Sequence, residues 1–179
     1  MTSPINLHPG PSAGFDDPFE MLAACHQRVE RMLGLLERLA AHLREAGADA
    51  QARQAAQDVM RYFDTAGPAH HEDEERHVFP VLQAAGEASL LQRLQQDHVT
   101  MAAAWALLRQ DLQAVADGKT AAVDAARDVR WRDFAALYRV HIEAEEAQAY
   151  PIAQPRLDAA AERAMGREMA ERRGVPGPA

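Results

Sequence analysis

The twenty residues 61–80 read RYFDTAGPAHHEDEERHVFP, and a related stretch, RDFAALYRVHIEAEEAQAYP, occupies 132–151. A shift of 71 positions aligns the two on one pattern, F-x6-H-x3-E-E-x3-[F/Y]-P. A histidine and a glutamate four residues apart on a helix differ in direction by only about 40°, so each copy presents an imidazole and a carboxylate on one side. Two such copies that face each other predict a metal-binding cage. Its members would be His70, Glu74, His141 and Glu145.

The rest of the chain is typical of an all-α protein. Its 179 residues are enough for one domain with a substantial core. Good helix formers are abundant, and the alternation of apolar and polar residues that marks strands is scarce. Apolar residues instead recur at spacings of three and four, which predicts an up-down-up-down antiparallel four-helix bundle with short turns. The helices are expected over about 18–44, over 50–85 with a break at Gly67-Pro68, from about Leu91 to Val115 and from about Trp131 to Ile152.

Three segments are expected along the chain. Residues 1–16, rich in proline and glycine, are predicted to form a flexible arm, and 17–152 the bundle. Residues 153–179 should form a C-terminal extension with a peripheral, frayed helix. Pro80 and Pro151 each remove one helical hydrogen bond, so each should bend its helix just beyond the repeated motif.

Charge and cysteine content exclude several classes of partner. A formal net charge of -8 disfavours nucleic acid and anionic membranes, because both select basic surfaces. No apolar run approaches the roughly 18 residues that span a bilayer. The N-terminal stretch lacks the pattern of a signal peptide, and Cys25 is the single cysteine, which points to a reducing cytoplasm. A monomer and a homodimer both remain open.

The four predicted helices each carry one histidine on their apolar stripe. One such histidine is usually an ordinary core residue, but four of them together with two His-x3-Glu pairs favour a metal centre. Two carboxylates on inward stripes need compensation, and the Lys and Arg residues fall mostly on other faces. A pair of divalent cations would compensate both carboxylates, and mixed imidazole and carboxylate donors suit Fe, Mn or Zn. The expected ligands are His26, His70, Glu74, His98, His141 and Glu145.

Neighbouring residues leave alternatives open. His71 and Glu75 form a second His-x3-Glu pair, but only His70 and Glu74 keep register with the second copy. Glu75 and Glu146 are expected either beside the ligands or in solvent, and His77 at the boundary of the site. Two further residues, Cys25 and Tyr138, are expected to be an inert buried thiol and, in preference to a cavity edge, a core aromatic.

At these residues the sequence resembles the hemerythrin-like, HHE cation-binding family. The resemblance covers about residues 17–152. It implies a four-helix bundle that holds two non-haem iron ions bridged by two carboxylates, with Mn or Zn as substitutes. Matched position by position, it implies the same six ligands, with Glu74 and Glu145 as the bridges.

Departures from the oxygen carriers of that family narrow the expected function. The carriers have a second histidine four residues after the first on their third helix, where this chain has Ala102. Their last carboxylate is an aspartate five residues after its histidine, whereas Glu145 follows His141 by four. Four histidines leave more vacant metal positions than five. This composition resembles members implicated in iron-centre repair, nitric oxide handling and iron sensing, although the chain contains neither the cysteine-pair domain nor the ubiquitin-ligase module of those proteins.

The sequence therefore predicts a stand-alone diiron protein that binds, senses or reduces a small ligand such as O2, NO or peroxide. Two alternatives stay open: a non-catalytic module for iron handling or donation, and a bundle whose metal is structural. Whether any reaction turns over is not decided by the sequence.

Overall fold

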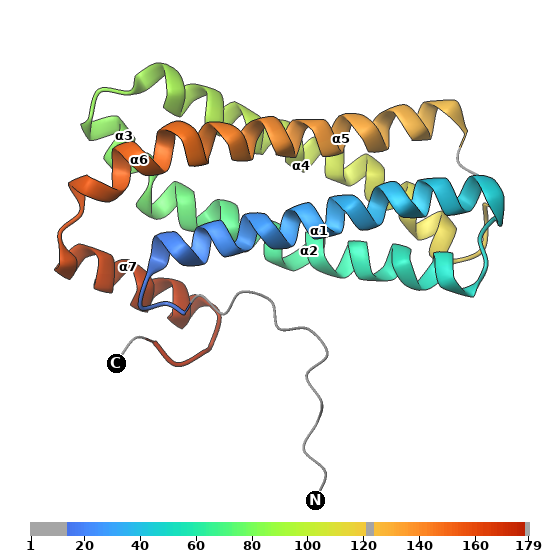
Figure 1. The fold of residues 1–179 in the computed structure, drawn as a ribbon, viewed down its shortest axis with the longest axis horizontal. Coiled ribbons are helices and arrows are strands. Elements are labelled where there is room, and N and C mark those ends of the chain that lie inside the picture. The colour runs from blue at the N-terminus through green and yellow to red at the C-terminus, as the bar shows by residue number, and fades with distance from the viewer. Residues whose placement is uncertain (1–13, 121–123, 178–179) are drawn as a thin grey trace, which may run out of the picture.

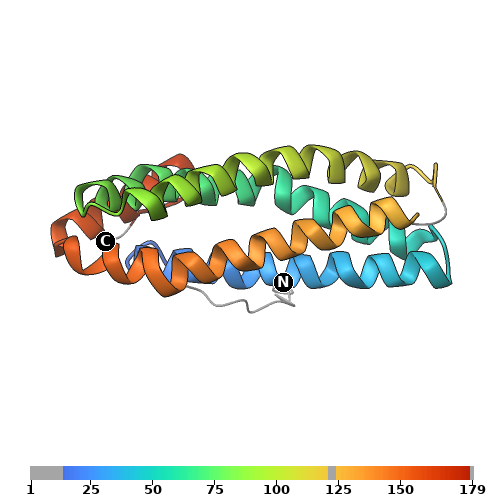
Figure 2. The same cartoon turned by 90° about the horizontal axis from the view of Figure 1, so that it is seen from above.

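The computed structural model describes residues 14–120 and 124–177, so most of the predicted N-terminal arm, and residues 121–123, lie outside it. Four long helices run antiparallel in chain order (Figure 1). Each contacts the next, and the last contacts the first. Figure 2 shows the four from above, running lengthwise along the molecule. The described residues contain no strand. The long helices are α1 (Pro18–Glu45), α2 (Ala50–His77), α4 (Ala88–Ala116) and α5 (Ala125–Ala144).

Short polar residues and glycines set the ends of these helices. Asp17 precedes α1 and accepts a hydrogen bond from the Glu20 N–H at 2.9 Å, and Asp49 and Asp124 cap α2 and α5 in the same way. Gly47 follows α1 with φ of 74°, a left-handed conformation that glycine adopts without steric cost. The connection between α1 and α2 is therefore a short turn that holds these two helices antiparallel.

The core falls into two apolar clusters, one toward each end of the bundle. The larger cluster includes Leu36, Phe63 and Phe134, and the smaller includes Leu22 and Leu82. Between the two clusters, every long helix places one buried histidine, and α2 and the residue that follows α5 add the buried carboxylates of Glu74 and Glu145. The polar site is thus enclosed by apolar packing above and below.

The predicted break at Gly67-Pro68 is wrong, because α2 continues unbroken from Ala50 to His77. One proline removes a single helical hydrogen bond, and the buried residues on either side, Phe63 and His70, keep the helix in place. Gly67 is buried, and a Cβ built there would make only ordinary van der Waals contact, 3.6 Å from the Tyr138 hydroxyl.

The helix does break later, at Val78, just before Pro80. The short helix α3 (Phe79–Ala84) begins there with Pro80 at its second position, in line with the bend expected from that proline. The helix that carries the second copy of the motif does not break, but its hydrogen-bonding pattern changes. After α5 the chain forms one π-helical turn, Glu145–Ala149, and then α6 (Tyr150–Ala153) and a 3-10 turn (Gln154–Arg156).

This π turn corrects the predicted apolar stripe of the last helix. A regular spacing of three residues after Glu145 points to Gln148 as the next residue of the stripe, but Gln148 is exposed, and Ala149 and Tyr150 are buried instead. On a regular α-helix, residues five apart point about 140° away from each other. A π turn closes with a hydrogen bond over five residues, here from the Tyr150 N–H to the Glu145 carbonyl, and therefore brings Tyr150 to the same face as Glu145.

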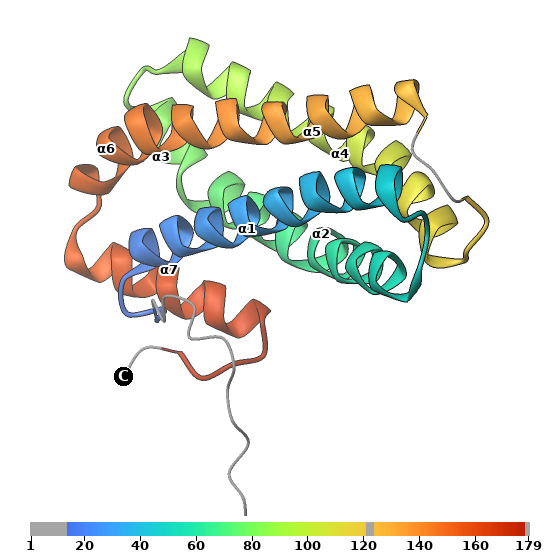
Figure 3. The same cartoon turned by 45° about the vertical axis from the view of Figure 1, so that its right-hand side comes forward.

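The C-terminal helix α7 (Ala159–Arg172) lies against the end of the bundle near the start of α1, as Figures 1 and 3 show. The expected frayed character is wrong, since Met165 and Met169 are fully part of the smaller apolar cluster. Arg172 and Arg173 also form ion pairs with Asp73, a fully buried residue of α2. Within the described ranges, no helix has the length and apolar character needed to cross a membrane.

Candidate metal centre

The six residues expected as ligands come together between the two apolar clusters. None is more than 5% exposed. They come from all four long helices, with Glu145 at the first position of the π turn. They form two groups whose donor atoms all lie within 4.8 Å of one another: His26, His70, Glu74 and Glu145 in one group, and His98, His141, Glu74 and Glu145 in the other.

The two glutamates each extend one oxygen toward each histidine pair. Glu74 Oε1 lies 3.3 Å from His70 Nε2, and its Oε2 lies 3.4 Å from His98 Nε2. Glu145 Oε2 lies 3.2 Å from His26 Nε2, and its Oε1 lies 2.9 Å from His141 Nε2. This is the arrangement that carboxylates adopt when they bridge two cations.

Several of these donor atoms are buried and have no hydrogen-bond partner within the described part of the chain: Glu74 Oε2, both oxygens of Glu145 and both ring nitrogens of His70. Buried polar atoms without partners are rare, and each requires an explanation. Nitrogens and oxygens that approach closely without hydrogen-bond geometry direct their lone pairs at a common point. The cluster is therefore compatible with metal cations at these points, and its imidazole and carboxylate donors suit Fe, Mn or Zn.

Burial sets the protonation of the metal-free site. Burial lowers the pKa of His70 to about 3 and lowers the pKa of His141, so both imidazoles are neutral and able to act as ligands. Burial and the charge of Glu74 raise the pKa of Glu145 well above its ordinary value. Burial acts in the same direction on Glu74, but the neighbouring histidines, His70 first, outweigh it and hold its pKa well below the usual range. Without metal, a proton taken up by the two glutamates therefore binds to Glu145 in preference to Glu74.

Carboxylates on the outer side orient three of the four histidines. Glu75 Oε1 lies 2.8 Å from His98 Nδ1, and Glu146 Oε1 lies 2.9 Å from His26 Nδ1. Asp97 Oδ2 lies 3.3 Å from His141 Nδ1. Such contacts fix the ring so that Nε2 faces the centre. Glu75 and Glu146 thus lie beside the histidines, one of the two positions expected for them.

The remaining neighbours occupy distinct places. Because Glu75 faces His98, the alternative pair of His71 and Glu75 does not converge on one point. His77 Nε2 lies 2.7 Å from Glu168 of α7, away from the centre. Cys25 is buried, and burial raises the pKa of its thiol, as an unreactive cysteine requires. Tyr138 is a core aromatic packed against Phe63 and Phe134.

Two residues that contact the candidate ligands, Tyr150 and Asp97, were not predicted from the sequence. Tyr150 donates a hydrogen bond from its hydroxyl to Glu74 Oε1 at 2.5 Å. The Tyr150 hydroxyl oxygen also lies 3.2 Å from His26 Nε2. The signal for it was present in the repeat, where Tyr150 aligns with Phe79, but a regular helix would have turned it away. Asp97 directly precedes His98, and no spacing rule singles it out.

Residues 17–153 match the family model of the hemerythrin HHE cation binding domain. The chain belongs to this family. A similar protein is an uncharacterised one from Haemophilus influenzae. It is 29% identical over 171 residues, which span 94% of this chain and 97% of that protein. The similarity therefore extends over α7 as well as the bundle.

Proposed function

We propose that this hemerythrin-family protein holds two non-haem iron ions and binds, senses or reduces a small ligand such as O2, NO or peroxide. The observation that supports this is the pair of four-donor groups that share both glutamates. We assign His26 and His70 to one ion, His98 and His141 to the other, and Glu74 and Glu145 to both. The proposed compartment is a reducing cytoplasm, in which Cys25 stays a thiol.

The donor count leaves room for an exogenous ligand. Two imidazoles and two carboxylate oxygens supply four donors to each ion, which leaves about two of the six positions that iron commonly fills. Iron bound there would supply electrons and open coordination positions for a small molecule. The protein places the donors on four packed helices, orients three imidazoles through outer carboxylates, and covers the centre with apolar clusters toward both ends of the bundle.

Iron storage or donation without turnover is the alternative. It is favoured by the open cavity beside His98, which gives that half of the site access to solvent. A structural metal would fit the same donors, and zinc would serve as well as iron.

Metal analysis and spectroscopy distinguish these functions. Anaerobic loading with Fe(II) should give close to two ions per chain, and exposure to O2, NO or H2O2 should change the visible spectrum in a ligand-dependent way. Slow oxidation without ligand-dependent features would favour iron handling, and zinc in place of iron after growth with both metals would favour a structural role. A single tightly held ion after full loading would contradict the dinuclear centre.

Variants of the motif test the assignment of the bridges. Glu74→Ala and Glu145→Ala should each abolish the dinuclear centre, because each removes a donor shared by both ions. Glu75→Ala and Glu146→Ala should leave two ions bound at saturating metal. If Glu75→Ala empties the site while Glu74→Ala does not, the assignment of His70 and Glu74 is wrong.

A further inference from the structure

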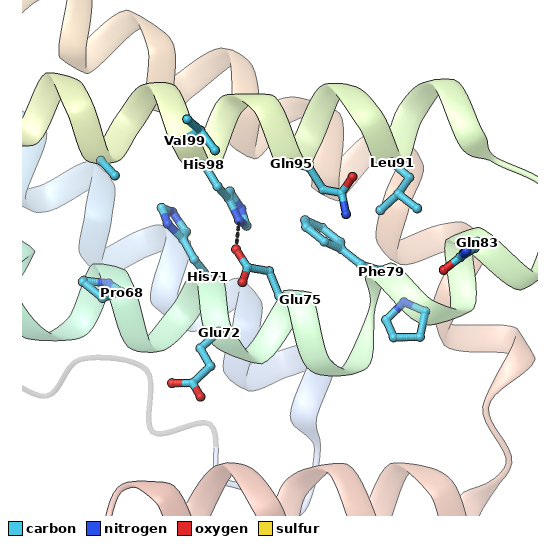
Figure 4. Close-up of a pocket in the computed structure, with 12 residues that line it drawn as sticks. Pro68, His71, Glu72, Glu75, Phe79, Gln83, Leu91, Gln95, His98 and Val99 are labelled. Atoms are coloured by element: carbon cyan, nitrogen blue, oxygen red, sulfur yellow. Dashed lines mark hydrogen bonds and ion pairs between the residues drawn. The ribbon is translucent and has the colours of Figure 1, made fainter.

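An open cavity of about 820 Å³ lies on the face of the bundle between α2, α3 and α4. His71 and Glu75 face it from α2, Phe79 from α3, and His98 from α4 (Figure 4). Ala102, one turn after His98, also lines it, and its small side chain leaves this space open. The cavity therefore gives an approach from solvent to one half of the candidate centre, the half that contains His98.

His71 lies on this approach and has a ring nitrogen that makes no hydrogen bond to the described residues. Its ring stacks on the ring of His98, with centroids 4.0 Å apart and planes inclined by 12°. Its Nε2 atom is buried and has no hydrogen-bond partner among the described residues. A buried ring nitrogen without a partner is costly, so this atom lacks a contact that a bound molecule would provide.

The donor atoms place His71 beside the metal position but outside its donor group. His71, His98 and His141 have donor atoms within 4.8 Å of one another. The group that contains both glutamates with His98 and His141 does not include His71. Ligands on opposite sides of one iron ion are only about 4.2 Å apart when each bond is about 2.1 Å, the length of a metal–imidazole bond. His71 is thus next to the two imidazoles on the cavity side, and it does not belong to the donor group that holds both carboxylates.

The second copy of the motif offers no such group. The residue that aligns with His71 is Ile142, and the one that aligns with Phe79 is Tyr150, whose hydroxyl is already bonded to Glu74. The two halves of the centre therefore differ, and the half at His98 and His141 is the one with an unused hydrogen-bonding group beside an open cavity.

We propose that a small anion or diatomic molecule enters through this cavity to the half of the centre at His98 and His141, where His71 Nε2 donates a hydrogen bond to it. A neutral imidazole carries one N–H, and the proposal places that hydrogen on the buried Nε2. The inference rests on the proposed dinuclear function. It assigns the side on which the ligand binds and the residue that recognises it.

Azide is the probe for the test, with the iron-loaded full-length protein. His71→Ala, His71→Gln and the wild type are compared by iron content and by optical titration with azide. His71→Ala should hold two ions but bind azide about tenfold to a hundredfold more weakly, the loss expected for a hydrogen bond to a charged group. His71→Gln keeps an N–H of similar reach and should recover most of the affinity. Ile142→Ala, the matched change in the second copy, should leave the affinity unchanged.

Each outcome is decisive. Unchanged azide affinity in His71→Ala, or equal weakening in His71→Gln, would overturn the hydrogen bond. Loss of one ion in His71→Ala would also overturn the proposal, because His71 would then be a metal ligand. A wild-type protein that does not hold two ions would instead contradict the proposed function.

The route of entry is tested separately by stopped-flow mixing with azide. Ala102→Phe places a bulky ring in the cavity, and it should slow azide association while iron content stays the same. An unchanged association rate would overturn the cavity as the entrance.

Discussion

Each copy of the repeated motif contributes ligands from its own helix and also contacts a histidine on a second helix. His70 and Glu74 face the centre from their own helix, whereas Glu75 and Phe79 contact His98 on α4. In the second copy, Glu146 and Tyr150 contact His26 on α1 in the same way. Each motif therefore supplies two ligands and also supports the single histidine of a neighbouring helix, which explains why α1 and α4 need no motif of their own.

The supporting carboxylates give the first prediction. Glu75→Gln and Glu146→Gln should each weaken the retention of one ion, since removal of an outer partner of a metal-bound histidine typically costs 10-fold to 100-fold in metal affinity, about 1 to 3 kcal/mol. Competition with a chelator, followed by iron analysis, measures the loss. Glu143→Gln, an exposed change on α5, is the control. Equal retention in the control and both variants would show that these carboxylates do not tune the site.

Tyr150 gives the second prediction. Its hydroxyl is the donor to Glu74 Oε1, so Tyr150→Phe leaves an ionised, fully buried carboxylate with one hydrogen bond fewer. The metal-free variant should be less stable by about 2 kcal/mol, the size expected for a hydrogen bond to a charged group. Urea unfolding of the chelated protein measures it. Phe79→Tyr adds the same hydroxyl at the aligned position, which faces the open cavity beside His98, and should not be stabilising. An unchanged unfolding free energy in Tyr150→Phe would mean that water replaces the hydroxyl.

Much of this site could be predicted from the sequence, and the residues that could not be predicted were missed for physical reasons. Four of the six predicted donors lie in pairs because a spacing of four residues places His70 beside Glu74 and His141 beside Glu145. His26 and His98 join them because they lie on apolar stripes that face the core. The position of Tyr150 was not predicted because one π turn changes the direction of every side chain after Glu145. The sequence does not show where a helix changes from α-type to π-type hydrogen bonds. The position of Asp97 depends on how α4 is rotated against α5, which is a property of tertiary packing.

At the scale of elements, α7 acts as a support behind α2. Asp73 is fully buried directly before Glu74, and it forms ion pairs with Arg172 and Arg173. Glu168 of α7 contacts both Arg172 and His77. The sequence predicted only a peripheral helix here, because the apolar stripe of α7 is short and its anchoring charges look like ordinary surface residues.

The third prediction removes this anchor. Asp73→Ala leaves two partly buried guanidinium groups without their buried partner, so the unfolding free energy of the metal-free protein should fall by about 3 kcal/mol. Limited proteolysis should then cleave within α7 before the bundle. Glu171→Ala, an exposed change on the same helix, is the control. Proteolysis that attacks α7 and the bundle together in Asp73→Ala would show that α7 is not a separately released element.

At the scale of the whole molecule, the fold and the centre have different sources of stability. The apolar stripes alone predicted the bundle, and the two clusters that they form are complete without metal. The centre between them places two carboxylates within one buried site, which opposes folding when both are ionised. The bundle should therefore form without metal and gain stability from it.

The last prediction concerns this gain and its dependence on pH. Metal binds the folded chain far better than the unfolded one, so iron loading should raise the melting temperature. In the metal-free protein, the pKa of Glu145 is raised above its value in the unfolded chain, so the stabilising contribution of Glu145 is lost as pH rises from about 4.5 through the raised pKa of the folded state. Burial lowers the pKa of His70 and His141, so the unfolded chain takes up protons on them first and their contribution is lost as pH falls below about 6.5. Glu74 has a lowered pKa, and its opposite contribution is lost only at lower pH.

Between pH 5 and 8, the gap in melting temperature between loaded and chelated protein should therefore widen with rising pH. It should narrow toward pH 5, because the proton that the folded metal-free protein then holds on Glu145 competes with metal for that carboxylate. Circular dichroism melts of both forms across this range measure the gap, and the chelated protein should keep its helical signal before melting. Identical melting temperatures at every pH would mean that the buried donors do not bind metal in the folded bundle, and the assignment of the six ligands would fail with them.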